Sequence, residues 1–392
     1  MGHTRSLLRE WGSGTVILSP RDLSDDQLRR FSKDVRKLNG ELLVDPQFYL
    51  PHSHHHRLVA HEYWPDDYDS VVFWSGSELE ALLTRLHDLN RDLDTKATLL
   101  PGLHGSSVSS DWLIQQQAIL EGAERVGIPP EDSFATVALS DTALLSDANV
   151  EDLLEGSRDW SPHGVYLICE HPQGDYLVDN PTWLANQLDL IAGWRLRGKQ
   201  VVVGYSNHQN LLAAAAGATA IASGTWMNVR SFPPDKFRVQ YEEEIRRRTT
   251  WYYAPAALSE FKIPYLDIAA RQSLLADLKP DHPFPQSHTA PLFSGAQPSA
   301  TGFSERDAFR HYLQCLRIQS EAATDLSFDR TLDGLQSTLD NAERVLDGLH
   351  AVGVSGQGRD FGDCIGPCRA AIGVLKTTRG PVLRREWRNL TT

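Results

Sequence analysis

The stretch Val201–Arg230, VVVGYSNHQNLLAAAAGATAIASGTWMNVR, contains two short apolar runs, and a group of polar and aromatic residues follows each run. The first run is β-branched and stops at Gly204, and an alanine-rich segment then leads to a second run that stops near Ala222. This pattern is typical of a strand–helix–strand unit. Because parallel strands all end at one edge of their sheet, we expect both polar groups to line one site.

Short apolar runs of the same kind recur before this stretch, with helical patterns between them. The predicted strands are Thr15–Ser19, Glu41–Val44, Ser70–Trp74, Ala97–Leu100, Phe134–Leu139, Val165–Cys169, Val201–Gly204 and Thr219–Ala222. Alternating strands and helices favour a parallel α/β fold, and this number of strands matches a (β/α)8 barrel of the TIM type, which takes about 250 residues. A doubly wound open sheet is the alternative if Ser70–Trp74 is not a strand.

Capping residues mark where several of the helices begin. Ser24 with Gln27, and Ser77 with Glu80, each predict a capping box at the start of a helix. The dipeptide Asn180–Pro181 predicts another helix start, because asparagine caps well and proline fits the first helical turn.

After Arg230 the chain loses its regular alternation of strands and helices. A charged helix is predicted in YEEEIRRR, an aromatic cluster in TWYYAP, and a further helix up to Leu278. Residues 279–303 are rich in Pro, Ser and Gly and predict a linker, and helical periodicity resumes beyond them. We therefore expect a TIM-type barrel with its extension over residues 13–278 and a small all-helical domain over residues 304–392.

Composition and charge exclude several classes of protein. The apolar content of 41% and charged content of 23% are ordinary for a globular protein. The formal net charge of −13 gives no broad attraction to a phosphate backbone or to an anionic membrane. The four cysteines suit a reducing compartment, and the longest near-apolar run, Leu211–Ala222, is too short to span a bilayer. We expect a cytoplasmic protein without a membrane partner.

Polar residues at the predicted strand ends are the first candidate site. If the barrel forms, its mouth collects Arg21, Asp22, Asp45, Gln47, His104, Glu170, His171, Tyr205, Asn207, His208, Ser223, Trp226 and Asn228. Carboxylates and imidazoles that converge in a partly dry cleft are suited to proton transfer, because burial and neighbours tune their pKa values. The alternative is that these residues only form the polar loops that end the strands of any α/β fold.

Two further motifs have possible chemistry. The histidine-rich stretch PHSHHHRLVAH suggests a divalent metal held as in metal-dependent amidohydrolase barrels. Its predicted ligands are His52, His54, His171, His208 and Asp267. The stretch RRRTTWYY sets Arg246, Arg247 and Arg248 beside aromatic rings, which suggests a nucleic-acid contact, or else a charged helix face followed by core aromatics.

One family resemblance rests on two motifs. The stretch GYSNHQNLLAAAAGATAIASGTWMNVR resembles, in its layout, the last two strands of the tRNA-guanine transglycosylase superfamily barrel. The stretch LLVDPQFYLP is similar to that family's strand ending in Asp-Ser-Gly-Gly-Phe, so Asp45 matches its aspartate and Phe48 its aromatic residue. The resemblance extends over roughly Thr15 to Leu278. The chain has no carboxylate near Ala222 for the family's nucleophilic aspartate and no cysteines for its zinc site.

The resemblance implies a barrel enzyme that handles a purine-like base of the 7-deazaguanine type, in nucleic acid or in a nucleotide, and we take a transglycosylase-like glycosyltransferase as the leading hypothesis. Its predicted catalytic residues are Asp45, Glu170 and His171. Its predicted substrate-binding residues are Gln47, Phe48, Tyr205, Asn207, His208, Ser223, Trp226, Asn228 and Arg230. Amides can hydrogen-bond a heterocycle edge, aromatic rings can stack on it, and arginine can hold a phosphate.

Two hypotheses from other classes stay open. One is the metal-dependent hydrolase that the histidine-rich stretch suggests. The other is a non-catalytic binding barrel, in which the helical region 304–392 recruits a partner protein or mediates self-association.

Overall fold

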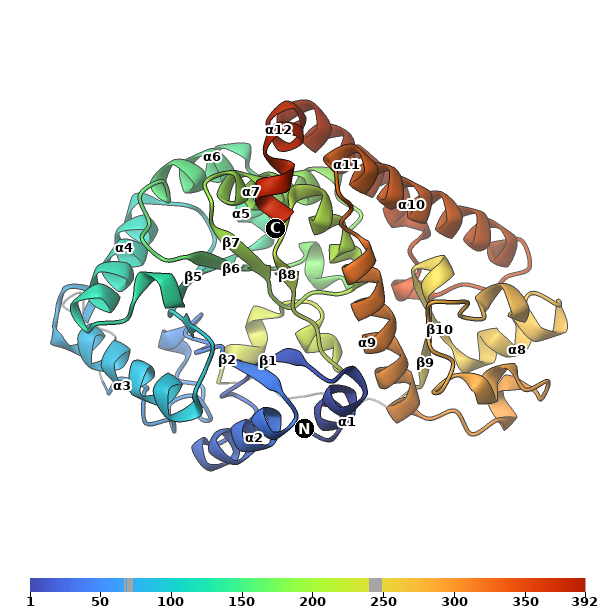
Figure 1. The fold of residues 1–392 in the computed structure, drawn as a ribbon, viewed down its shortest axis with the longest axis horizontal. Coiled ribbons are helices and arrows are strands. Elements are labelled where there is room, and N and C mark those ends of the chain that lie inside the picture. Colours follow the sequence, from blue (N-terminus) through green and yellow to red (C-terminus); the bar gives the residue numbers. More distant parts are fainter. Residues whose placement is uncertain (67, 69–72, 240–248, 392) are drawn as a thin grey trace. The chain divides into compact units, whose positions relative to one another are not determined.

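A computed structural model describes residues 1–66, 68, 73–239 and 249–391 (Figure 1). The chain forms two compact units. The first contains the described residues of Met1–Glu170, Arg197–Gly204 and Phe232–Glu243, and the second contains those of His171–Leu196, Tyr205–Ser231 and Glu244–Thr392. The residues that the sequence assigns to one barrel mouth are therefore divided between the two units.

The first unit contains two groups of parallel strands. Strand β1 (Gly14–Leu18) pairs in parallel with β2 (Gly40–Val44), with Leu18 opposite Val44. The second group consists of β3 (Thr98–Leu99), β4 (His104–Gly105), β5 (Ser133–Leu139), β6 (Gly164–Cys169) and β7 (Gln200–Val203). Strand β5 pairs in parallel with β3, β4 and β6, and β6 pairs in parallel with β7. The prediction of a parallel α/β fold is confirmed.

The central strands are buried along their whole length because they are covered on both faces. Every residue of β5 and of β6 is buried, which is typical of strands inside a parallel sheet. Gly164 begins β6 because a larger residue does not fit there: an added Cβ would lie 2.3 Å from the Phe134 ring of β5. The close packing of β6 against Phe134 thus depends on glycine, which has no Cβ, at position 164.

The first unit contains six described α-helices, and two of their starts test the predicted capping boxes. They are α1 (Gly2–Trp11), α2 (Asp25–Lys37), α3 (Ser77–Leu93), α4 (Ser110–Arg125), α5 (Asp141–Leu144) and α6 (Asp147–Gly156). The capping box of Ser24 and Gln27 is present at α2. The predicted box of Ser77 and Glu80 is wrong, because Gly76 is the capping residue and Ser77 is already in the helix.

The strand predictions for the first unit differ from the structure at two places. Of Ser70–Trp74, residues 70–72 lie outside the described residues, and Phe73–Ser75 forms a 3-10 turn. Strand β4 was missed because two residues in the turn-rich stretch PGLHG form no pattern that a sequence can reveal. Its pairing with β5, His104 opposite Ala138, is a tertiary contact.

The second unit is mainly helical. Its α-helices are α7 (Pro181–Leu196), α8 (Ile263–Arg271), α9 (Glu305–Ala322), α10 (Phe328–His350), α11 (Gly362–Thr378) and α12 (Gly380–Thr391). Helix α7 begins at the predicted cap, where the Asn180 side chain accepts hydrogen bonds from the backbone of Thr182 and Trp183. Helix α11 packs against α7, α10 and α12 (Figure 1). The helical C-terminal region is confirmed.

The remaining elements of the second unit are short. They are the 3-10 helix η5 (His208–Ala216), β8 (Ala220–Ile221), and the antiparallel hairpin of β9 (Trp251–Ala254) and β10 (Ser259–Lys262). The predicted linker 279–303 contains 3-10 turns at Ala290–Phe293 and Pro298–Ala300, and it buries Leu292 within the second unit. Among the described residues, no helix has both the length and the apolar character that crossing a membrane requires.

Candidate functional site

A group of polar side chains lies just beyond the strand ends of the first unit. We call Asp22, Asp45, Tyr49, His104 and Glu170 the strand-end cluster. Asp45 follows β2 directly and is 3% exposed. Its Oδ1 accepts hydrogen bonds from the Tyr49 hydroxyl at 2.6 Å and from the Gln47 backbone N–H at 3.0 Å. The second bond closes an Asx turn, which supports the left-handed φ of +55° at Gln47.

Two buried cations lie beside these carboxylates. Lys236 is 1% exposed, and its Nζ lies 3.6 Å from Oδ2 of Asp22. Arg21 donates from Nε to the backbone carbonyl of Lys236 at 2.9 Å and from Nη1 to Asp22 at 2.9 Å. Burial lowers the pKa of Lys236, and Asp22 opposes this shift. The Asp22 side chain is 41% exposed; its partial burial favours a higher pKa, but Lys236, Ser19 and Arg21 together hold that pKa below its usual value.

The carboxylate–imidazole pair of His104 and Glu170 is more open to solvent. His104 lies on β4 and Glu170 directly after β6, with His104 Nε2 3.2 Å from Glu170 Oε2. Their side chains are 12% and 23% exposed. The backbone of Phe232 pairs with Glu170 in a parallel bridge, and the Phe232 ring contacts both His104 and Tyr49, at centroid distances of 5.6 and 5.1 Å. Phe232 thus connects this pair to the buried carboxylate of Asp45.

This arrangement is suited to proton transfer. An imidazole beside a carboxylate is a pair of side chains that general acid–base catalysis commonly uses. Asp45 and Tyr49 form a second, buried pair whose geometry the surrounding rings hold in place. Acid–base chemistry on a substrate bound at these strand ends is therefore possible without groups from the second unit.

Two predicted substrate-binding residues of the first unit have structural roles. The Gln47 amide accepts from the Arg21 backbone N–H at 2.9 Å and donates to Ser19 Oγ at 2.9 Å, so it ties the ends of β1 and β2 together. The Phe48 ring is buried and packs on Trp64 at a centroid distance of 4.9 Å. Neither side chain is presented to a ligand.

In the second unit, Arg230 belongs to a buried ion-pair group. Its Nη1 lies 3.3 Å from Glu260 Oε1, and its guanidinium stacks over the Tyr312 ring at 3.5 Å. Glu260 also accepts from Arg359 at 2.8 Å and from the Tyr176 hydroxyl at 2.7 Å. Burial favours a higher pKa for Glu260, but the two arginines hold that pKa below its usual value. Arg230 therefore neutralises a protein carboxylate, where the sequence suggested a phosphate.

Asn207 and His171 also bond within the protein. The Asn207 side chain caps η5 by accepting from the Gln209 N–H at 2.8 Å, and it donates to the Tyr176 carbonyl at 2.6 Å. The His171 ring bonds the Asp175 carbonyl at 2.9 Å. At both positions the polar side chain forms hydrogen bonds with the backbone of the protein itself.

The other predicted residues of the second unit have varied surroundings. Trp226 is exposed and contacts Phe309 at a centroid distance of 5.2 Å. Tyr205 is buried and adopts a left-handed φ of +51°. Ser223 and Asn228 are half-buried, and His208 lines a cavity. That all these residues share one mouth with the strand-end cluster stays a prediction.

The metal hypothesis gains no support from the described residues, where no three His, Cys, Asp or Glu side chains are grouped as a metal ion would need. Asp267 instead accepts from Gln297 Nε2 and from the Ser299 N–H, both at 2.9 Å. His54 pairs with the Tyr68 hydroxyl at 2.5 Å. The basic residues Arg246, Arg247 and Arg248, predicted to contact nucleic acid, lie outside the described residues.

The sequence matches no model of a known protein family and no curated protein sequence. The function must therefore be argued from the sites themselves.

Three site residues were not predicted from the sequence: Tyr49, Phe232 and Lys236. Tyr49 is four residues beyond Asp45, which places it next to a predicted site residue and is a signal that could have been used. Phe232 and Lys236 come from the turn-rich FPPDKF stretch, where nothing in the sequence indicates a return to the ends of β1, β2 and β6.

Proposed function

We propose that the strand-end cluster is the active site of a transglycosylase-like enzyme that acts on a purine-like base in nucleic acid or in a nucleotide. The observation that carries the proposal is Asp45, a buried carboxylate held at the end of β2 by Tyr49 and by the Asx turn. A carboxylate fixed in this way is suited to attack a sugar carbon or to act as a general base. The similarity of LLVDPQFYLP to a transglycosylase motif supports the same position.

His104 and Glu170 supply the complementary chemistry. When the bond between a base and its sugar breaks, the departing base carries negative charge and needs a proton. His104, whose Nε2 lies 3.2 Å from Glu170 Oε2, is the group that would donate that proton. The buried Phe232 ring contacts both His104 and Tyr49 and so fixes the two pairs relative to each other.

We further propose that the strands belong to a (β/α)8 barrel of the TIM type. The two strand groups of the first unit are joined by a hydrogen bond from the Lys96 N–H, just before β3, to the Leu42 carbonyl of β2 at 2.8 Å. With this link, the order β1, β2, β3, β5, β6, β7 follows the chain, as it does in a barrel. A site at the carboxyl ends of such strands is the usual location for catalysis in that fold.

The test is an Asp45→Asn variant in an assay for release or exchange of the base, with nucleosides, nucleotides and RNA as substrates. We expect turnover to fall at least about a hundredfold, because asparagine can neither attack nor accept a proton. The control is Asp88→Asn, an exposed aspartate of α3 that pairs with Arg91, which should keep the parental turnover. Unchanged turnover of Asp45→Asn would refute the assignment.

A further inference from the structure

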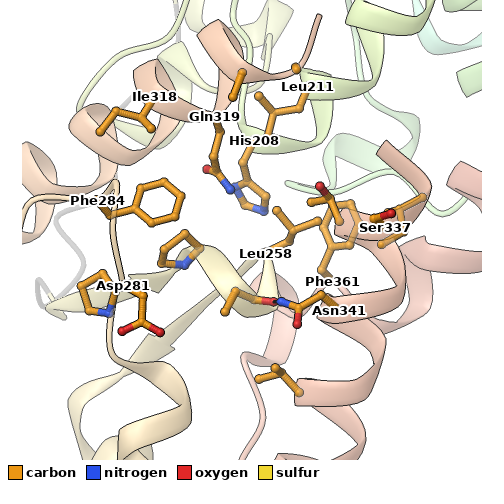
Figure 2. A pocket seen from close by; sticks show the side chains of 18 of the residues that line it. His208, Leu211, Leu258, Asp281, Phe284, Ile318, Gln319, Ser337, Asn341 and Phe361 are labelled. Carbon is orange, nitrogen blue, oxygen red and sulfur yellow. Dashed lines mark hydrogen bonds between the residues drawn. The ribbon is translucent and has the colours of Figure 1, made fainter. Parts of the chain in front are cut away.

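The second unit contains a cavity of about 670 Å³ (Figure 2). Segments far apart in the chain line it: η5, the turn between β9 and β10, residues 276–284, α9 and α10. A volume of this size is within the range of pockets that bind small molecules. The cavity lies wholly within the second unit, so its contents do not depend on the strand-end cluster.

A buried imidazole faces this cavity (Figure 2). His208 is 1% exposed, and the Leu258 backbone is a weak hydrogen-bonding neighbour that can engage one ring nitrogen, so at least one ring nitrogen has no partner. Neighbouring rings pack against it, with Tyr253 at 5.0 Å and Phe361 at 5.7 Å between centroids. A buried polar group without a partner costs free energy, so its position at a cavity calls for a ligand.

The imidazole of His208 is neutral at physiological pH. Burial lowers its pKa to about 4; Glu260 and the Leu258 backbone act to raise this pKa, and Arg230 and Arg359 act to lower it. A neutral ring has one nitrogen that donates and one that accepts. It therefore suits a hydroxyl or an amide, which can do both, better than a formal charge.

The rest of the lining favours an uncharged, mainly apolar occupant. Leu258, Phe284, Ile318 and Phe361 supply apolar walls (Figure 2). The lining also contains acidic and basic side chains, among them Asp277, Asp281, Lys279 and Arg344, and all four are exposed. Because both signs of charge are present and lie in water, neither anions nor cations are strongly preferred.

We propose that this cavity binds an uncharged aromatic or alicyclic molecule whose hydroxyl or amide group forms a hydrogen bond with His208. The proposal concerns a second site, separate from the transglycosylase-like chemistry proposed for the first unit. The apolar part of the ligand contacts the side chains of Leu258, Phe284, Ile318 and Phe361, and its polar group forms a hydrogen bond with the buried imidazole.

The first experiment uses the full chain and 2-naphthol, with binding measured by calorimetry or by the fluorescence of the probe. Ala322→Trp fills the cavity from α9, where Ala322 is an exposed lining residue. Glu321→Trp adds the same side chain one position earlier, at an exposed residue outside the lining, and is the matched control. We expect Ala322→Trp to weaken 2-naphthol binding at least about tenfold and Glu321→Trp to bind as the parent does. Equal affinities for the two variants would overturn the proposal.

The second experiment isolates the hydrogen bond. Naphthalene has the same rings without the hydroxyl, and 2-naphthoate has a negative charge in its place. We expect His208→Phe to reduce the preference for 2-naphthol over naphthalene about three- to tenfold while naphthalene still binds. We also expect the parent to bind 2-naphthol more tightly than 2-naphthoate. A preference that His208→Phe leaves unchanged, or tighter binding of 2-naphthoate, would overturn the role assigned to His208.

Discussion

Replacing Glu260 by a neutral residue tests how much the buried ion pairs with Arg230 and Arg359 contribute to stability. Glu260 is 3% exposed and lies within 3.4 Å of Arg230 and 2.8 Å of Arg359. The two arginines keep its pKa low, so the side chain is ionised at neutral pH. A Glu260→Gln variant keeps the shape but leaves the buried Arg230 without its countercharge. Removing one partner of a buried ion pair costs about 3–5 kcal/mol, and we expect the free energy of unfolding to fall by that amount.

The matched control is Glu343→Gln. Glu343 makes a comparable two-pronged pair with Arg369, at 2.7 and 3.0 Å, but its side chain is 46% exposed. Water replaces the lost partner there, so we expect a much smaller loss of stability. Urea unfolding of the full-length parent and both variants, followed by circular dichroism, measures the difference. If the two substitutions cost the same, burial does not control the strength of the Glu260 group and the reasoning fails.

Three further predictions concern single contacts. Tyr49→Phe removes the hydroxyl that donates to Asp45 at 2.6 Å. The free energy of unfolding, measured by thermal unfolding, should fall by about 1.5–3 kcal/mol, as for a hydrogen bond to a charged group. An unchanged melting temperature would contradict this prediction. Burial lowers the pKa of His311 to about 4. Between pH 6.5 and 4 the unfolded chain therefore binds a proton that the folded chain does not. The free energy of unfolding should fall by up to about 3 kcal/mol as the pH decreases through that window. His311→Gln should reduce that slope in unfolding curves measured across the same window, and an identical slope would count against the burial argument. Gly164→Ala should destabilise by about 1–3 kcal/mol in urea unfolding, because the new methyl group meets the Phe134 ring at 2.3 Å, and a neutral effect would mean that the ring can move aside.

The first group of strands and its helix were predictable because their signals are local. The run before Asp45 is apolar, Ser24 and Gln27 cap the helix that precedes it, and both features act within a few residues of the chain. The same locality explains a failure. Ser77 and Glu80 have the spacing of a capping box, but Gly76 is the residue with extended backbone at that helix start, and the spacing alone does not decide which residue leaves the helix.

Partners far apart in the sequence were not predictable. The Arg230 side chain has the chemistry to bind a phosphate, and only folding brings Glu260 to it, thirty positions along the chain. Gln47 has the chemistry to bind a heterocycle, and only the adjacent end of β1 occupies its amide through Ser19. In both cases the partner within the protein comes from a distant segment, which the sequence does not identify.

By itself, the sequence of this protein determined the alternation of strands and helices, the parallel arrangement and the polar character of the strand ends, because periodicity and capping depend on near neighbours. The tertiary structure alone decided that Lys236 lies beside Asp22, that Phe232 connects two pairs of side chains, and that His208 faces a cavity with at least one ring nitrogen unpartnered. The physical reason is that the charge state of a side chain, and whether its hydrogen-bond donors and acceptors are satisfied, depend on what surrounds it in space. Most of those neighbours are distant along the chain.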